Sequence, residues 1–414
     1  MPLSMLGKAP FASVLTAVIL SLPPAAAGAV EPVDLPAAPP VRRTLALEEV
    51  WRVGGNDDDI LLGLVTSGVI DENGNVLLVD RQLSRVVVIS PDGELVGTLG
   101  REGDGPGELR RLQGVFIAGE RVGLVQGFPG KVVFIDRLGA PAGGFTLGGT
   151  NGRSDFCSIR DLRCVGTALV VHADYSSEDF AADRCRTHET LLALDLDGTI
   201  QAELVSHDVT RGMRNVVLDE AASWAEFHHW AVSGGGLVAT VAERDAWSVN
   251  VRGLDGDLRS VLRRPCRPRR RTDEEKEKAA DGIRLSTVVA GATMERKPLD
   301  TDPVIVDLQF ADDGRLFVTT CHNAARQLPD GVAGRFDVID PAGTFLEELT
   351  LAFPGVDPGQ DVLVFLDGTR FLLLRNFEDA EKAIHAANLP EEEREDPGDA
   401  EPFEVVLVKV VIDR

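Results

Sequence analysis

The sequence predicts an all-β fold, a six-bladed β-propeller with four-stranded antiparallel blades. Three observations lead to this fold: strand-like segments rich in β-branched residues recur, tight turns containing glycine separate them, and one strand-like segment near each end of the chain has no neighbour of its own. The clearest pair of strands covers residues 76–79 and 85–89, flanked by turns at 71–74 and 90–93. Glycine supplies the positive φ that such turns need.

The same four-strand unit repeats along the chain. The turn between its first and second strands contains a glycine six times: Gly74, Gly119, Gly166, Gly235, Gly314 and Gly368. The turn between its third and fourth strands contains one five times: Gly93, Gly139, Gly198, Gly256 and Gly343. The last unit ends at its third strand, residues 404–412, so we expect residues 45–53 to supply the fourth strand and close the ring. The propeller then covers residues 43–414, and seven blades is the alternative count.

Residues 1–29 have the features of a secretory signal peptide. Lys8 gives a positive start, and the apolar run over 11–22 is too short to span a membrane. An uncleaved anchor helix is the alternative, which Pro23 and Pro24 disfavour. Residues 30–42 are rich in Ala and Pro, which predicts a flexible linker. We therefore expect a periplasmic or secreted protein.

Composition narrows the possible partners. The chain has 66 Asp and Glu against 42 Lys and Arg, a formal net charge of −24. Such an acidic protein repels phosphate backbones, so we expect no nucleic-acid partner. No stretch after the signal peptide reaches the apolar length of a membrane span. We expect a monomer that binds a protein or a small molecule, which the composition does not identify.

Five cysteines are present, an odd number that leaves at least one thiol unpaired in a monomer. Cys157, Cys164 and Cys185 lie close together in the sequence. Because an exported protein folds in an oxidising compartment, we expect one disulfide among these three.

The first unit resembles a known repeat. Residues 74–80 and 85–89, followed by the glycine-rich loop 100–109, resemble the NHL-type repeat of bacterial exported six-bladed β-propeller proteins. The remaining units match only by their strand and turn pattern. The resemblance implies the fold and export, but no single activity, because the fold serves binding modules, lactonases and lyases.

The insertions fall on one predicted face, which we call the long-loop face; the glycine turns define the opposite, tight-turn face. The insertions cover residues 174–189, 206–228, 263–302, 322–334 and 376–402. Long loops on a rigid scaffold are typical of a binding site. A capping box at Thr272–Glu275 predicts a helix to about residue 289, and Asn376 begins a second helix to about 387.

The second strand of each blade should end on the long-loop face, close to the channel that runs through the centre of the propeller. The residues at these ends are the candidate ligand-binding residues Asp80, Gln126, His172, Glu243, His322 and Arg375. The alternative is that each satisfies its own loop. The arginine-rich run over 263–271 could dock an anion, but pairing with Asp273–Glu275 or with the acidic stretch 391–401, or exposure to solvent, is the favoured interpretation.

We therefore predict an exported scaffold that binds a partner or ligand through its long-loop face, with no cofactor. The alternative is a metal-dependent hydrolase of the lactonase kind, or a lyase, at the mouth of the central tunnel. A divalent cation such as calcium or zinc would then be needed. The possible ligands are His172, His228, His229 and His322 for zinc, and Asp80, Glu243, Asp307 and Asn323, or the run 56–59, for calcium. No catalytic motif is present, so no catalytic residue is assigned.

Overall fold

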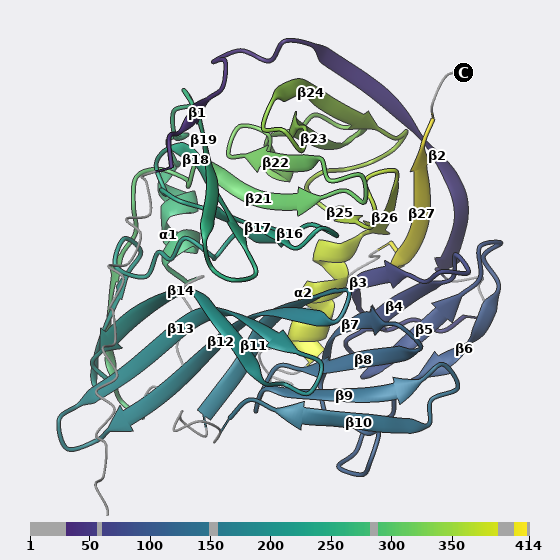
Figure 1. Cartoon of the computed structure of the whole chain (residues 1–414), viewed down its shortest axis with the longest axis horizontal. Coiled ribbons are helices and arrows are strands. Elements are labelled where there is room, and N and C mark those ends of the chain that lie inside the picture. Colours follow the sequence, from purple (N-terminus) through teal and green to yellow (C-terminus); the bar gives the residue numbers. More distant parts are fainter. Residues whose placement is uncertain (1–29, 56–59, 149–155, 282–288, 388–400, 412–414) are drawn as a thin grey trace, which may run out of the picture.

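A computed structural model describes residues 30–55, 60–148, 156–281, 289–387 and 401–411. The described chain is all-β apart from two short α-helices and one turn of 3₁₀ helix, η1 (Ala325–Gln327). Antiparallel sheets of at least four strands follow one another around a common centre, which is the arrangement of a β-propeller (Figure 1). The predicted signal peptide lies outside the described residues.

Four of these sheets are separate, and each follows the predicted order of neighbouring strands. The first contains β3 (Val65–Ile70), β4 (Val76–Asp80), β5 (Arg85–Ile89) and β6 (Leu95–Leu99). The second contains β7 (Leu112–Ala118), β8 (Arg121–Gln126), β9 (Lys131–Asp136) and β10 (Pro141–Thr146). The third contains β11 (Phe156–Val165), β12 (Ala168–Asp179), β13 (Arg184–Asp195) and β14 (Ile200–Arg211). The fourth contains β16 (Trp230–Val232), β17 (Leu237–Val241), β18 (Trp247–Gly253) and β19 (Leu258–Arg264), with β1 (Val33–Asp34) parallel to β19.

Eight further strands form one continuous sheet instead of two separate blades. Its order is β21 (Ile305–Phe310), β22 (Leu316–Thr320), β23 (Val332–Ile339), β24 (Phe345–Ala352), β2 (Arg42–Gly54), β27 (Glu404–Val410), β26 (Arg370–Arg375) and β25 (Val362–Phe365). β2 runs parallel to β24 over Arg42–Ala46 and antiparallel to β27 over Leu47–Gly54. The predicted six separate blades are therefore corrected to four separate sheets and one sheet that β2 joins.

The first and last strands pair as the sequence predicts. β2 contains the predicted strand 45–53, and it lies on the outer side of β27, which begins at the predicted residue 404. Part of the segment predicted to be a linker also contacts the propeller, because β1 pairs with β19 and Leu35 is buried in the core.

The glycine turns adopt the predicted backbone conformation. Glycines in ten of the eleven turns have positive φ at the predicted positions, and in the fourth sheet Gly236, instead of its neighbour Gly235, takes this role. In the first turn, the N–H of Gly74 donates to the carbonyl of Asp71, and the Asp71 carboxylate accepts the N–H groups of Asn73 and Asn75. Each such turn fixes the register of the two strands that it joins.

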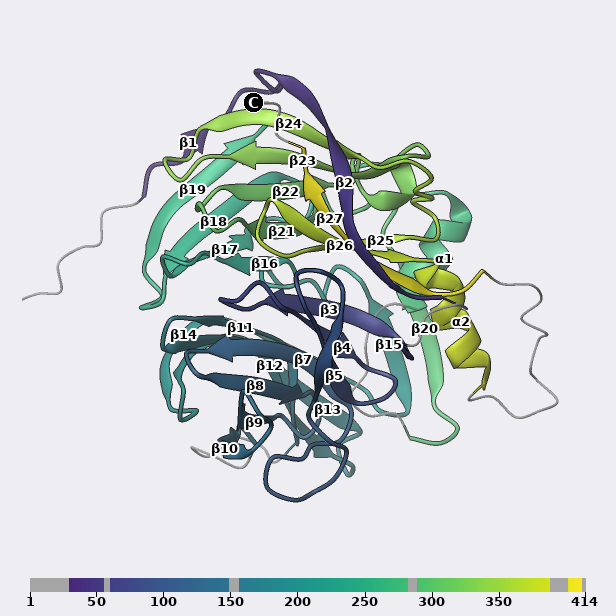
Figure 2. The same cartoon turned by 90° about the vertical axis from the view of Figure 1, so that its right-hand side faces the viewer.

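The larger inserted elements lie on one face (Figure 2). They are α1 (Asp273–Asp281), α2 (Phe377–Ala387) and a parallel pair formed by β15 (Asn215–Asp219) and β20 (Thr293–Lys297). The predicted capping box is confirmed: Thr272 Oγ1 accepts the Glu275 N–H, and the Glu275 carboxylate accepts the Thr272 N–H. The predicted extension of α1 over 282–288 lies outside the described residues.

The structure shows no disulfide among the five cysteines, all of which lie in its described part, so the expected disulfide is not confirmed. Cys157 and Cys164 lie on the same strand, β11, and seven residues of strand separate their Cα atoms by about 23 Å. Cys185 lies on β13, two strands away from β11, which is roughly 9 Å or more. A disulfide needs Cα atoms within about 7 Å, so strand geometry keeps these three thiols apart.

Candidate functional site

A cavity of about 530 Å³ opens among the third sheet, the segment between β15 and β16, α1 and β21. A second cavity, of about 480 Å³, is lined by the first strand of each four-strand group, namely β3, β7, β11, β16, β21 and β25, and by tight turns beside them. Both cavities contain Arg163 and Gln309, so they are the two ends of one central channel. The first cavity is therefore the mouth of the channel on the long-loop face, and it is the candidate site.

One wall of this cavity is a hairpin that the sequence did not predict. β12 and β13 pair without interruption to Asp179 and Arg184, so most of the insertion 174–189 is strand. Asp174 and Glu189 are directly opposite each other in this hairpin, and both line the cavity. The extended hairpin thus carries two carboxylates from the sheet to the mouth of the channel.

Asp174 is buried with an incomplete set of hydrogen bonds. Its side chain is 5% exposed, and its Oδ2 accepts a hydrogen bond of 2.7 Å from Arg160. Its Oδ1 is buried and has no hydrogen-bond partner among the described residues. Burial raises the pKa of this carboxyl even though Arg160 opposes the shift.

Glu189 and His228 form an oriented pair. The N–H of Ala225 donates to Nδ1 of His228 at 3.4 Å, which leaves the proton on Nε2, 3.2 Å from the Glu189 carboxylate. Burial alone would raise the pKa of Glu189, but the hydrogen bond from His228 and nearby imidazoles outweigh it and lower that pKa. The neighbouring carboxyls Asp174 and Glu189 therefore have pKa values shifted in opposite directions.

The other histidines of the cavity pack against aromatic rings. The His172 ring lies edge-on to Phe227 with centroids 5.1 Å apart, and 6.3 Å from the His228 ring. Burial lowers the pKa of His229 to about 4, so this imidazole is neutral at pH 7. Trp224 also lines the cavity, and its indole N–H is buried without a hydrogen-bond partner among the described residues.

Of the six predicted site residues, the structure places only His172 in the cavity. Asp80 Oδ1 accepts the N–H of Leu83 in its own loop, and Oδ2 accepts the N–H of Gly63 in the segment before β3, each at 3.0 Å. Gln126 bonds likewise to the backbone of Phe128 in its own loop and of Arg110 in the segment before β7. Each side chain thus satisfies its own loop, the alternative that the sequence left open, and also the segment that leads into its sheet.

The remaining three lie elsewhere as well. Arg375 pairs with Asp361 at 3.0 Å, and His322 Nε2 donates to a backbone carbonyl at 2.8 Å. Glu243 is exposed. The second strands end on one face, but the side chains at their ends do not converge there. A role for these side chains in binding therefore stays a prediction.

The possible metal ligands do not fit a shared site. Of Asp80, Glu243, Asp307 and Asn323, only Asp307 lines the cavity. Both ring nitrogens of His228 are already engaged. Among the described residues, no three His, Cys, Asp or Glu side chains are grouped to hold a metal ion.

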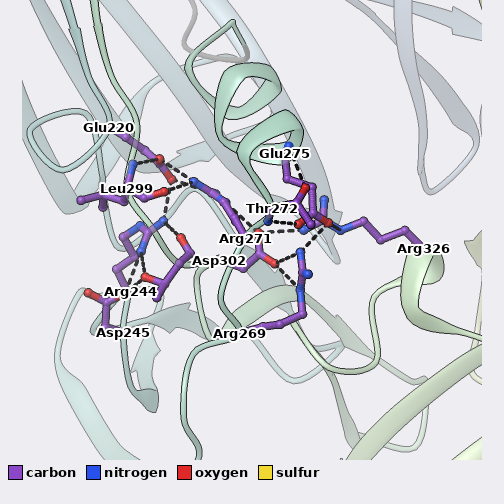
Figure 3. Close-up of polar contacts among 11 residues, drawn as sticks. Glu220, Arg244, Asp245, Arg269, Arg271, Thr272, Glu275, Leu299, Asp302 and Arg326 are labelled. Atoms are coloured by element: carbon purple, nitrogen blue, oxygen red, sulfur yellow. Dashed lines mark hydrogen bonds and ion pairs between the residues drawn. The ribbon is translucent and has the colours of Figure 1, made fainter.

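The arginine-rich run is used to build the cavity (Figure 3). Asp302 accepts hydrogen bonds or ion pairs from Arg269, Arg271 and Arg326, all at 2.7–2.8 Å. Arg271 also pairs with Glu220 at 2.7 Å, and Arg269 pairs at 2.7 Å with the predicted partner Glu275.

This ion network joins α1 to the segment that follows β15. Glu220, which follows β15, lines the cavity, and so does Ala279 of α1. The network therefore fixes two walls of the cavity. The sequence predicted Glu275 as a partner of the run but missed Asp302 and Glu220, which are far from it in the chain. The acidic stretch that was the other predicted partner lies largely outside the described residues.

Among the described residues, no helix is long and apolar enough to cross a membrane. No protein-family model matches the sequence, and no curated protein matches it.

Solved structures with a similar arrangement include three bacterial proteins. A member of the DUF4221 family from Bacteroides vulgatus is 10% identical with a TM-score of 0.46, and the match covers 89% of this chain and 98% of that one. Virginiamycin B lyase from Staphylococcus aureus is 10% identical with a TM-score of 0.42, covering 88% and 99%. Regucalcin, a calcium-binding protein from Agrobacterium tumefaciens, is 11% identical with a TM-score of 0.41, covering 90% and 98%. At these identities and scores, the matches assign no activity or ligand to this chain.

Proposed function

We propose that this protein is an exported six-bladed propeller of the NHL-like kind that binds a small polar molecule at the long-loop mouth of its channel. The blade count is supported by the strand order. The eight-stranded sheet divides at β2 into two groups of four, and six strands line the second cavity. The signal-like sequence of residues 1–29 and the repeat-like residues 74–109 support export and the NHL-like kind.

The buried carboxylate of Asp174 is the observation that carries the binding proposal. Leaving a buried acceptor without a partner costs about 1–3 kcal/mol, and most buried polar atoms in proteins have a partner. Asp174 lies in the wall of a cavity of about 530 Å³, a volume typical of small-molecule sites. A ligand that donates a hydrogen bond here would remove the cost.

A second candidate function is an acid–base enzyme, a hydrolase or lyase. The opposite pKa shifts of Asp174 and Glu189 favour it, because neighbouring carboxyls with separated pKa values can act as acid and base. This form of the enzyme needs no metal.

Tryptophan fluorescence of the mature chain, titrated with a library of polar metabolites, tests the binding function, because Trp224 and Trp230 line the cavity. Asp174→Asn and His228→Gln should each weaken binding at least tenfold. The matched controls Asp92→Asn and His385→Gln, both exposed and outside the cavity, should leave binding unchanged. A ligand whose affinity responds only to substitutions on the tight-turn face would contradict the proposal.

Turnover separates the two functions. Each ligand found, and a panel of lactones and esters, is incubated with the protein after metal chelation and followed by mass spectrometry. Product formation that Asp174→Asn or Glu189→Gln abolishes would establish the enzyme, and binding without turnover would establish the scaffold.

A further inference from the structure

Most charged side chains that line the cavity already have a partner of opposite charge. These pairs are Arg160–Asp174, Arg163–Asp161, Glu189–His228, and Glu220 with Arg244 and Arg271. Two charged side chains of the same cavity, Arg211 and Asp307, have no such partner among the described residues. These two determine which ligand fits.

Arg211 is the last residue of β14 and is partly buried. Its guanidinium donates one hydrogen bond, of 2.8 Å, to Ser223 Oγ. No described carboxylate lies within ion-pair distance of it, although an arginine remains protonated in proteins and has five N–H groups to satisfy. Burial lowers the pKa of Arg211, and the opposing charge of Glu189, which is beyond ion-pair distance, does not reverse that shift.

Asp307 lies on β21, in a different sheet from Arg211. Its two carboxylate oxygens accept from the amide of Gln309, at 3.3 Å each, and the carboxylate also takes a backbone hydrogen bond from Leu308. Arg163 is a nearby cation, but no described Lys or Arg lies within ion-pair distance of Asp307. Burial raises the pKa of Asp307 to about 6, so it is mostly ionised at pH 7.

A cation and an anion without direct ion-pair partners in one cavity are both costly, because each is partly removed from water with no counter-charge within ion-pair distance. Arg211 and Asp307 do not relieve this cost by pairing with each other. A ligand with one carboxylate and one ammonium group would supply both counter-charges at once. A guanidinium fork also matches the two oxygens of a carboxylate.

We infer that the ligand is a zwitterion, an amino acid or a short peptide, whose carboxylate pairs with Arg211 and whose ammonium group pairs with Asp307. Trp224 and Trp230, which line the cavity, supply apolar surface for its side chains. The inference rests on the proposed small-molecule function and names its ligand class.

Isothermal titration of the mature chain with free amino acids and with di- and tripeptides tests the inference. The same compounds are also tested as N-acetyl and as C-terminal amide derivatives. We expect the free zwitterion to bind at least tenfold more tightly than either derivative. Comparing the affinities of single amino acids with those of di- and tripeptides then shows whether the ligand is an amino acid or a peptide.

Variants identify which residue recognises which group. Asp307→Asn should lower the affinity for the free zwitterion at least tenfold and abolish discrimination against the N-acetyl derivative. Arg211→Gln should also lower the affinity for the free zwitterion at least tenfold, and it should abolish discrimination against the C-terminal amide derivative. Arg259→Gln and Asp255→Asn, an ion pair beside a turn of the fourth sheet and outside the cavity, are matched controls that should bind like the parent.

Two outcomes overturn the inference. If no amino acid or peptide binds, or if the blocked derivatives bind as tightly as the free zwitterion, the ligand class is wrong. The proposed small-molecule function would still stand if another compound bound with sensitivity to Asp174→Asn, and it would fail together with the inference if no compound did.

Discussion

Leu47 of β2 pairs with Val410 of β27, so residues near the two ends of the described chain share one sheet. Leu47 is 5% exposed and packs in the same apolar cluster as Val408. One residue earlier, Ala46 still pairs with Ala352 of β24. A single strand therefore closes the sheet arrangement by bridging two four-strand groups.

Deleting residues 43–53 should strongly destabilise the protein. The deletion removes the outer strand from β27 together with Leu47, Trp51 and Val53, three side chains at most 5% exposed. It thereby exposes the two apolar clusters in which they pack. Burying side chains of this size contributes about 1.5–3 kcal/mol each, which is comparable to the whole stability of a typical domain. Urea unfolding measures the loss. Deleting only residues 30–35, which removes the two-residue β1, is the control, and we expect it to lower the stability less. If the 43–53 deletion unfolds at the same urea concentration as the parent, β2 does not close the sheet arrangement.

Gly93→Ala should cost more stability than Gly166→Ala, although both glycines have positive φ. At Gly93, with φ of +90°, a new Cβ would lie 2.8 Å from the Trp51 Cβ in the neighbouring sheet. At Gly166, with φ of +60°, a new Cβ meets nothing within 4 Å. We expect about 1 kcal/mol for Gly166→Ala from backbone strain, and roughly 1–3 kcal/mol more for Gly93→Ala from the clash. Equal losses in thermal unfolding would show that the contact with Trp51 does not matter.

The fold could be predicted from the sequence because its determinants are local. β-branched runs such as 85–89 specify strands, and the glycine turns specify where the strands reverse. Thr272 and Glu275, three residues apart, specify where α1 begins through hydrogen bonds between them. The continuous sheet through β2 was missed because its parallel pairing with β24 joins residues about three hundred positions apart, and no local pattern reports such a contact.

The site was predicted less well because it depends on tertiary contacts. Polar residues such as Ser176 and Thr187 made the β12–β13 hairpin look like a loop, although both are buried in it. Asp80 was placed by register, but the backbone N–H groups of Leu83 and Gly63 satisfy its carboxylate. Arg211 and Asp307 are identified only by what they lack, and the sequence cannot show a missing partner.

Asp302→Asn should lower the free energy of unfolding by about 3–5 kcal/mol at pH 7, because it leaves Arg269, Arg271 and Arg326 without their shared buried anion. Burial alone would raise the pKa of Asp302, but hydrogen bonds from these arginines lower it overall. Its contribution is therefore present above the ordinary Asp pKa and lost as the pH falls through the lowered folded value. Urea unfolding at pH 7 and in acid should show the difference between parent and variant shrinking in acid.

Asp300→Asn is the matched control for the network. The Asp300 side chain is 82% exposed, and Lys276 is its one ion-pair partner among the described residues, so its replacement should change stability little. A loss for Asp302→Asn no greater than that for Asp300→Asn would mean that the network does not hold α1 over the cavity.

Asp307→Asn should stabilise the folded protein at neutral pH while weakening its binding. Burial raises the pKa of this carboxyl from 3.8 to about 6. Below about pH 3.8 the group is protonated in both the folded and the unfolded state. Between about pH 3.8 and 6 the unfolded state ionises while burial keeps the folded carboxyl protonated, so stability falls, and above the folded pKa the loss is complete. That loss is at most about 3 kcal/mol, and an asparagine avoids it. Unfolding measured from pH 3.5 to 8 should therefore show that parent and variant are equally stable in acid and that the variant is more stable above pH 6.

Asp92→Asn is the control. Asp92 is exposed on the tight-turn face, so the stability of this variant should follow that of the parent throughout the pH range. A variant that is less stable than the parent at pH 8 would show that Asp307 has a structural partner; a gain in stability with a loss of affinity is what a charge kept for a ligand requires.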